Sequence, residues 1–112
     1  MDLKTCILDS IPKGKNNRIS RVDLFRKLQA RGFLVGLKDD RPMREAIEEL
    51  RFTVEGAAIC SSRENGGGYW FGTQSEVREW TAQQKRMAVE MVKRANYQRR
   101  CADMYYQQAG LF

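Results

Sequence analysis

The sequence contains no histidine, and that absence removes much of the chemistry that a small enzyme would use. Histidine is the commonest general base and the commonest ligand of transition metals. The pair Gly14 and Lys15 does not form a phosphate-loop motif, because asparagine follows where Ser or Thr would bind magnesium. The carboxylates Glu45, Glu48 and Glu49 have arginines beside them and are typical of a salt-bridged helix surface. We therefore expect no enzymatic activity, no cofactor and no bound metal.

Cysteines and long apolar runs are also scarce. The three cysteines, Cys6, Cys60 and Cys101, are odd in number and far apart, which excludes a disulfide framework and a paired metal-ligand spacing. No apolar run approaches the roughly 20 residues of a membrane span. The N-terminal stretch MDLKTCILDS also lacks a signal-peptide core. We expect a soluble protein in a reducing, intracellular compartment, with no membrane partner.

Positive charge is in excess, because the sequence has 20 Lys and Arg residues and 14 Asp and Glu residues, a net charge of +6. Before Ser75 there are 13 basic and 10 acidic residues, and from Ser75 on there are 7 and 4, so each part carries +3. This balance favours a polyanionic partner, although mere solubility explains it equally well. At 112 residues the chain is long enough for one compact domain with a small core.

Two short helices joined by an extended piece are predicted at the start of the chain. The first runs over about residues 2–10, where apolar side chains recur at helical spacing before a proline. The stretch RIS then reads as extended, and Ser20 is a good N-cap for a second helix that Gly32 can end. The buried positions expected on the two helices are Leu3, Cys6, Ile7, Ile11, Val22, Leu24, Phe25 and Leu28.

A third helix and a β-hairpin are predicted next. Asp39 or Asp40 can cap a helix that reaches about Phe52 and buries one apolar face, made of Met43, Ala46, Ile47 and Leu50. The stretches AAICSS and YWFGT read as two strands, because the turn-forming cluster RENGGG separates them. The glycines of this cluster permit the positive φ angles that a tight loop needs.

One long helix is predicted over residues 75–109, followed by a tail at 110–112. Neither proline nor glycine occurs between Ser75 and Gly110, and either Ser75 or Thr73 can cap the helix. Side chains spaced alternately by three and four form a partly polar seam that continues to Tyr105. We expect the first part of this seam to pack against a second copy of the chain or against its own domain: Val77, Trp80, Gln84, Met87 and Met91.

The order of helix, extended piece, helix, turn, helix and hairpin resembles the winged helix-turn-helix domain, and the resemblance covers residues 2 to about 74. The stretches ILDSIPKGKNNRISRVDL, DRPMREAIEELR and AICSSRENGGGYWF look like winged-helix proteins of bacteriophages and prophages, which are typically labelled regulators or replication proteins. One departure is the stretch ARGFLVGLKDD, which makes the second-to-third helix connection longer than in that pattern. The angle of the third helix therefore stays open.

The resemblance implies that the third helix enters the major groove of duplex DNA and that the hairpin tip, the wing, lies on the adjacent backbone or minor groove. Arg41 and Arg44 would then face the bases. An alternative is that Arg41 with Glu45 and Arg44 with Glu48 form ordinary intrahelical ion pairs. The residues assigned to DNA are Lys13, Lys15, Arg18, Arg21, Lys38, Arg41, Arg44, Glu45, Glu48, Arg63, Asn65, Gly66, Gly67 and Gly68.

These expectations describe a mainly α protein with a small β-hairpin, in which a winged helix-turn-helix domain over residues 1–74 precedes the long helix. The predicted function is sequence-preferring binding of double-stranded DNA by a homodimer, in transcription regulation or phage replication within the cytoplasm of a bacterial host. The alternative function is a protein-interaction module, such as a phage-encoded inhibitor that binds a host or phage protein through its C-terminal helix.

Overall fold

A computed structural model describes residues 1–63 and 67–110 of the chain. The chain divides into two compact units, Met1–Val77 and Arg78–Phe112, and each is described by itself. The elements in chain order are α1 (Leu3–Ser10), a 3-10 turn η1 (Lys15–Asn17), α2 (Arg21–Ala30), α3 (Arg41–Leu50), β1 (Ile59–Ser62), β2 (Gly68–Phe71) and α4 (Gln74–Gln108).

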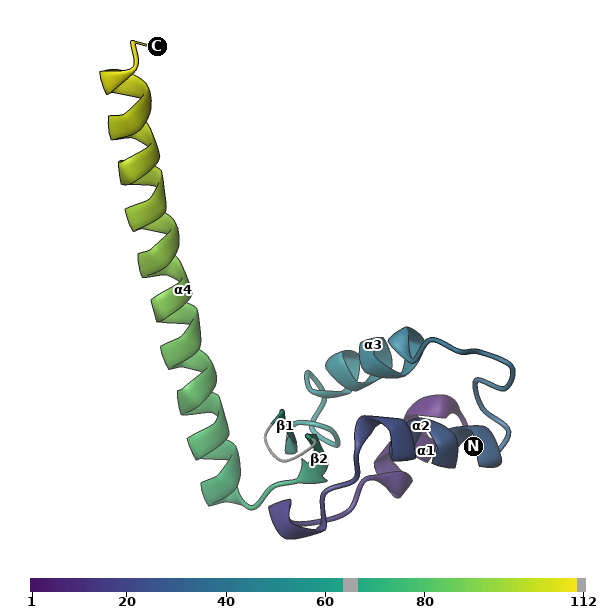
Figure 1. Cartoon of the computed structure of the whole chain (residues 1–112). Coiled ribbons are helices and arrows are strands. Elements are labelled where there is room, and N and C mark those ends of the chain that lie inside the picture. Colours follow the sequence, from purple (N-terminus) through teal and green to yellow (C-terminus); the bar gives the residue numbers. More distant parts are fainter. Residues whose placement is uncertain (64–66, 111–112) are drawn as a thin grey trace. The chain divides into compact units, whose positions relative to one another are not determined.

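The structure confirms the predicted fold class. The described chain is mainly helical, with β1 and β2 as an antiparallel hairpin and α4 as a long C-terminal helix. Three short helices followed by a hairpin give the winged helix-turn-helix order (Figure 1). Helix α3 ends at Leu50, slightly before the predicted end at Phe52.

Local capping signals explain where three of the helices begin. The Asp2 carboxylate accepts a hydrogen bond from the Thr5 N–H at 2.8 Å, and the Ser20 hydroxyl accepts one from the Asp23 N–H at 3.1 Å. At the start of α4, Thr73 and Glu76 exchange hydrogen bonds between side chain and backbone, which is a capping box. The hydrogen bond from the Thr73 N–H lowers the pKa of Glu76 below its usual value.

The hydrophobic core of the first unit lies between the three short helices and one face of the hairpin. Its buried members are Cys6, Ile7, Ile11, Leu24, Leu28, Met43, Ala46, Ile47, Leu50 and Ile59. All four apolar positions predicted for α3 are buried. One prediction for α2 is wrong, because Val22 remains 54% exposed. It occupies the outer edge of the α2 stripe, which no other element covers within the described residues.

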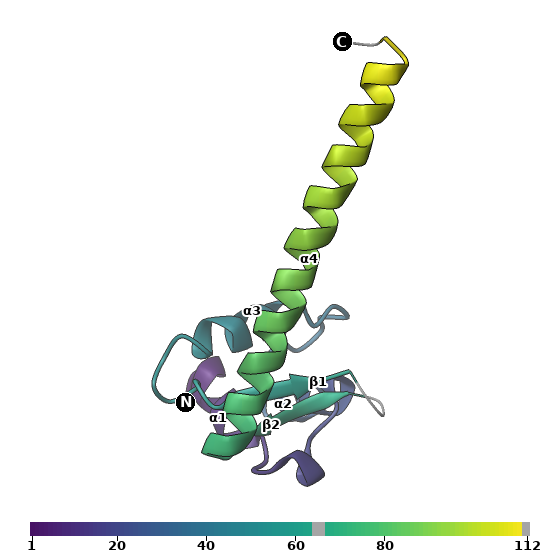
Figure 2. The ribbon, with the colours of Figure 1, turned by 90° about the vertical axis from the view of Figure 1, so that its left-hand side faces the viewer.

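The strand β2 has neighbours on both of its edges. On one edge it pairs with β1 in the register Cys60 opposite Trp70 (Figure 2). On the other edge, Ile19 and Tyr69 exchange backbone hydrogen bonds of 3.0 and 2.8 Å. The Phe71 N–H also donates to the Pro12 carbonyl at 2.8 Å. The predicted extended piece is therefore confirmed, and the loop that carries η1 is fastened to β2 at both of its ends.

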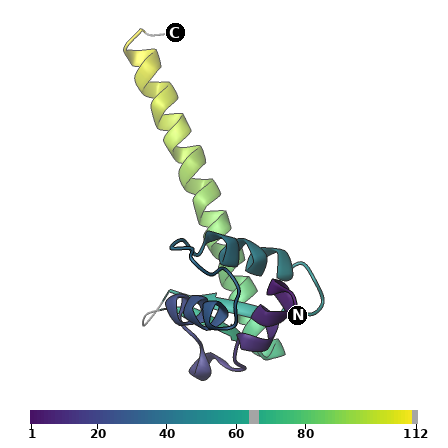
Figure 3. The same ribbon diagram turned by 90° about the vertical axis from the view of Figure 1, so that its right-hand side faces the viewer.

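Side-chain alternation along β2 divides the three wing aromatics between the two faces of the hairpin. Tyr69 and Phe71 pack against the core, and the three short helices lie on that side of the hairpin (Figures 1 and 3). Trp70 points to the opposite face with Cys60, yet it is only 3% exposed. The Lys15 ammonium lies 5.8 Å from the centre of its ring, within range of a cation–π interaction. Burial raises the pKa of the Cys60 thiol.

Candidate nucleic-acid interface

The long connection between α2 and α3 is held by local contacts, despite its departure from the usual short turn. The Gln29 side-chain amide donates to the carbonyls of Leu34 at 3.1 Å and Leu37 at 3.0 Å. Gly32, Leu34 and Gly36 adopt positive φ angles of 89°, 55° and 83°, which let the backbone reverse within a few residues. These bonds satisfy backbone groups that an ordinary exposed loop would leave to water, so the start of α3 has a defined position relative to α2.

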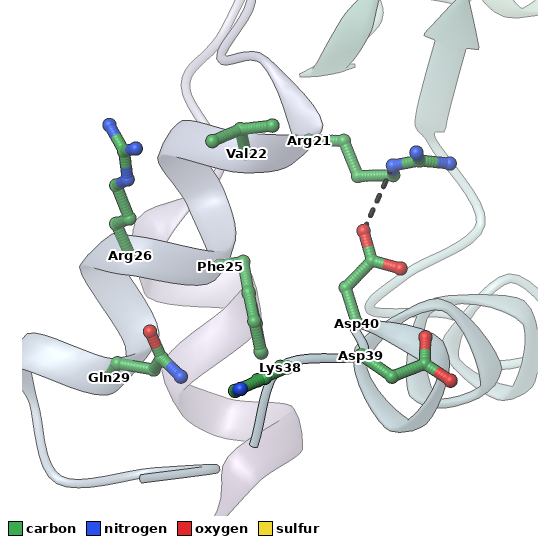
Figure 4. Close-up of a pocket in the computed structure, with 8 residues that line it drawn as sticks. All are labelled: Arg21, Val22, Phe25, Arg26, Gln29, Lys38, Asp39 and Asp40. Carbon is green, nitrogen blue, oxygen red and sulfur yellow. Dashed lines mark ion pairs between the residues drawn. The ribbon is translucent and has the colours of Figure 1, made fainter. Parts of the chain in front are cut away.

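Asp40 joins the start of α2 to the start of α3. Its carboxylate lies 2.9 Å from the Arg21 guanidinium and 2.9 Å from the Arg44 guanidinium, and its side chain is only 16% exposed. Figure 4 shows Arg21 and Asp40 pointing toward each other from their two helices. Asp40 makes no side-chain capping bond to α3, whereas the predicted alternative cap, Asp39, accepts a hydrogen bond from the Arg41 N–H at 3.0 Å.

The wing strand lies within electrostatic reach of this junction. Burial raises the pKa of the Tyr69 hydroxyl, and the charges of Arg21, Asp40 and Arg44 also act on it. Because Tyr69 pairs with Ile19 through the backbone, β2, the start of α2 and the start of α3 meet at one place. This meeting point is what a winged domain needs if its wing and third helix are to contact one duplex together.

The exposed surface of α3 carries less positive charge than its arginines suggest. Arg41 is 69% exposed and lies 3.7 Å from Asp39, while Arg44 is 44% exposed and bound to Asp40. The alternative pairing of Arg41 with Glu45 and Arg44 with Glu48 is wrong, since Glu48 pairs with Arg51 instead. Residues 39–51 hold three basic and five acidic side chains, a net charge of −2. Phosphates would therefore be repelled from much of this helix.

Positive charge is concentrated in the loop before α2 and in the first turns of α2. Residues 13–27 hold six basic side chains and one acidic side chain, a net charge of +5. Five cations lie on this loop, at the first residue of α2 and at the base of the wing, and together they are named the basic edge: Lys13, Lys15, Arg18, Arg21 and Arg63. Of these, Arg21 alone is in an ion pair within the described residues.

The basic edge borders the base of the wing directly. A Cβ on Gly68 would lie 2.8 Å from the Ile19 carbonyl oxygen and 3.2 Å from the Arg18 side chain. Gly67 has a φ of 75°, and a Cβ there would lie 2.7 Å from the Ser62 oxygen. Both glycines are therefore required by close backbone packing, and Gly68 is buried. Asn65 and Gly66, the other wing residues assigned to DNA, lie outside the described residues.

A hollow of about 430 Å³ extends this surface along α2 (Figure 4). Its apolar side is formed by Val22 and Phe25, and its cations include Arg26 and Lys38, neither of which is in an ion pair among the described residues. Lys38 was assigned to a phosphate from the sequence, whereas Arg26 was missed. Helical spacing could have found Arg26, because it lies four residues after Val22 and three before Gln29, which line the same hollow on α2.

Several other cations bind within the domain and are not free to contact a ligand. Arg51 donates to the Ile59 carbonyl at 3.1 Å and to the Ser61 hydroxyl at 3.0 Å, which ties the end of α3 to β1. Arg31 lies 2.8 Å from Asp9 and ties the end of α2 to α1. Arg51 and Arg31 therefore have structural roles. With these two arginines bound inside the domain, the basic edge is the main cationic surface of the first unit.

The side chains of the predicted dimerisation seam differ in exposure. Val77 and Trp80 are half-buried, and Gln84 is exposed. Met87 and Met91 are 60% and 67% exposed. The pairing of this seam in a homodimer stays a prediction.

The first unit thus has the three helices and hairpin of the winged helix-turn-helix order, with a cationic edge beside the base of the hairpin. Comparisons of the chain with protein-family models, with curated proteins and with solved structures find no match. Within the described residues, no cluster of His, Cys, Asp and Glu is arranged to hold a metal ion, and none of the helices could cross a bilayer.

The Asp40 junction makes a testable contribution to stability. Asp40→Asn should lower the free energy of unfolding by about 1 kcal/mol, because one substitution weakens two ion pairs at a partly buried position. Asp39→Asn is the matched control, since it removes the same charge from a side chain that is 62% exposed. Urea denaturation measures both, and we expect less than about 0.3 kcal/mol for Asp39. Equal losses would contradict the bridging role of Asp40.

Proposed function

We propose that the protein binds double-stranded DNA through the basic edge, the base of the wing and the start of α3. The observation that carries this proposal is the continuity of the three parts. Arg18 borders Gly68 of the wing, and Arg21 is joined through Asp40 to Arg44 of α3. Cations spaced along one edge can contact successive phosphates and fix the orientation of the domain on the duplex.

The loop of the basic edge is suited to this role because it is held in place. Backbone hydrogen bonds fasten it to β2 at residues 12–14 and again at Ile19. Inside the loop, the Arg18 guanidinium donates to the Lys15 carbonyl at 3.2 Å, and Asn17 donates to the Lys13 carbonyl at 3.0 Å. A loop ordered in advance loses little conformational entropy when it binds, so more of the contact energy appears as affinity.

Sequence preference would come from the first turn of α3. Arg41 is the most exposed arginine there, and a guanidinium can donate two parallel hydrogen bonds to guanine, worth roughly 1–3 kcal/mol of discrimination. Arg44 is held by Asp40, so its contribution to base contacts would be smaller. Glu45 and Glu48 would face away from phosphates or accept from a cytosine amine. The resemblance to phage proteins favours a role in transcription regulation or replication.

Salt dependence tests this proposal. A fluorescent random-sequence duplex is titrated with the protein at several salt concentrations, and log affinity is plotted against log salt. About four phosphate contacts predict a straight line with a slope of roughly −4. A slope near zero, or no binding, would reject the proposal and favour the alternative function of a protein-interaction module.

A further inference from the structure

The connection between α3 and β1 carries the two most exposed large apolar side chains in the described part of the chain. Phe52 is 90% exposed and Val54 is 93% exposed. Glu55, which is also exposed, follows directly, and residues 45–55 hold four acidic side chains and one basic side chain, a net charge of −3. We call Phe52, Val54 and Glu55 the acidic tip.

The acidic tip is held in place by its own backbone. The Thr53 hydroxyl donates to the Leu50 carbonyl at 2.6 Å and accepts from the Gly56 N–H at 3.1 Å. Gly56 is buried, and a Cβ there would collide with the same carbonyl. An ordered turn therefore displays Phe52 and Val54, and a turn ordered in advance loses little conformational entropy when a partner covers it.

The hollow on α2 is complementary to the acidic tip in shape and in charge. Val22 and Phe25 form its apolar side, and Arg26 and Lys38 are cations in no ion pair among the described residues. The two carboxylates that also line the hollow are each paired with an arginine. A volume of about 430 Å³ is within the range that holds a small organic ligand, so a phenylalanine side chain fits. The occupant that suits the hollow combines an apolar side chain with a carboxylate.

The acidic tip and the hollow lie at opposite ends of α3. Asp39 and Asp40 line the hollow directly before this helix, and Phe52 follows two residues after its end. Ten residues of α-helix span about 15 Å. Figure 3 shows the connection from α2 at one end of α3 and the connection to β1 at the other. One copy therefore cannot place its tip in its own hollow, and a contact between the two joins different copies.

We propose that the acidic tip of one copy docks in the hollow of a second copy. Phe52 would pack against Val22 and Phe25. Glu55, which is in no ion pair among the described residues, would pair with Arg26. Because the two surfaces differ, the contact is head-to-tail and can be repeated by further copies. This inference stands on the first unit alone and does not depend on DNA binding, although copies joined in this way would bind adjacent sites on a duplex cooperatively.

Sedimentation of the full-length protein measures this contact. The interface is small and its association weak, so the average mass should rise with concentration over roughly 10–500 µM at low salt. The rise should shrink as salt is added, because ion pairs contribute to the contact. An average mass that stays constant up to roughly 500 µM would overturn the proposal.

Two single substitutions separate the two halves of the contact. Phe52→Ser removes the tip and leaves the hollow intact, whereas Val22→Asp places a carboxylate in the hollow and leaves the tip intact. Each variant alone should associate at least about tenfold more weakly than the parent. An equimolar mixture of the two should restore association, but only as pairs, because one intact tip meets one intact hollow. Absence of rescue in the mixture would contradict the head-to-tail contact.

Matched controls lie on α4. Tyr97→Ser and Val89→Asp make similar changes at exposed side chains of the second unit and should leave association unchanged. If these controls weaken association and the tip and hollow variants do not, α4 joins the copies and the proposal fails. If the copies do not associate and Val22→Asp weakens duplex binding more than Val89→Asp does, the hollow binds nucleic acid instead. Circular dichroism confirms that each variant is folded, since every substituted side chain is more than half exposed.

Discussion

Replacing Trp70 with alanine should lower the free energy of unfolding by about 3–5 kcal/mol, which is a large part of the stability of a small domain. The side chain is 3% exposed and lies on the hairpin face away from the three short helices, opposite Cys60 in the strand register. Truncation would leave a cavity that the fixed β1–β2 pairing cannot close. Urea denaturation followed by circular dichroism measures the loss.

Replacing Trp70 with phenylalanine should cost much less, about 1–2 kcal/mol. The Trp70 indole N–H is buried without a hydrogen-bond partner among the described residues, so its removal breaks no hydrogen bond. Loss of a buried, unpartnered donor removes a desolvation penalty and offsets part of the lost packing. If phenylalanine is as damaging as alanine, packing of the ring alone does not explain the role of Trp70.

The second large effect concerns DNA. The triple substitution Lys13→Ala, Lys15→Ala and Arg18→Ala should weaken duplex binding on the order of 10²-fold at 0.1 M salt and reduce the salt slope by about three. The reason is that these three cations carry most of the positive charge of the basic edge and are in no ion pair among the described residues. Anisotropy titrations at several salt concentrations give both quantities.

The control removes three cations elsewhere. Lys85→Ala, Arg86→Ala and Lys93→Ala on α4 lower the net charge by the same amount and should change the slope by less than about one. The α4 triple should leave the unfolding curve unchanged, whereas the basic-edge triple should lower the free energy of unfolding slightly, because Arg18 is half-buried and donates to the Lys15 carbonyl. A larger loss from the α4 triple than from the basic-edge triple would move the DNA contact to the C-terminal helix.

Much of this fold could be predicted from the sequence because its signals are local. Ser20, Thr73 and Gly32 mark helix ends through their own side chains or backbone preferences, and each does so in the structure. The apolar spacing of α3 likewise predicts all four of its buried residues, since helical periodicity depends on neighbours within the same element.

The details of the candidate site depend on contacts between segments far apart in sequence, which spacing does not predict. The ion pair of Arg21 with Asp40 joins residues nineteen positions apart. Asp40 also binds Arg44, whose predicted role was contact with the DNA bases. The close approach of Gly68 to Ile19 is of the same kind. Val22 is exposed because no other described element packs over its part of α2. The periodicity of a single helix cannot reveal which neighbouring elements will cover it.

The most direct test of the proposed DNA interface is a two-dimensional amide NMR spectrum of the full-length protein, recorded as random duplex is added. The account predicts that the largest shifts fall on residues 13–21, on Gly67 and Gly68, and on the first turn of α3, while amides of residues 85–105 change little. Shifts confined to α4, with the basic edge unchanged, would contradict it.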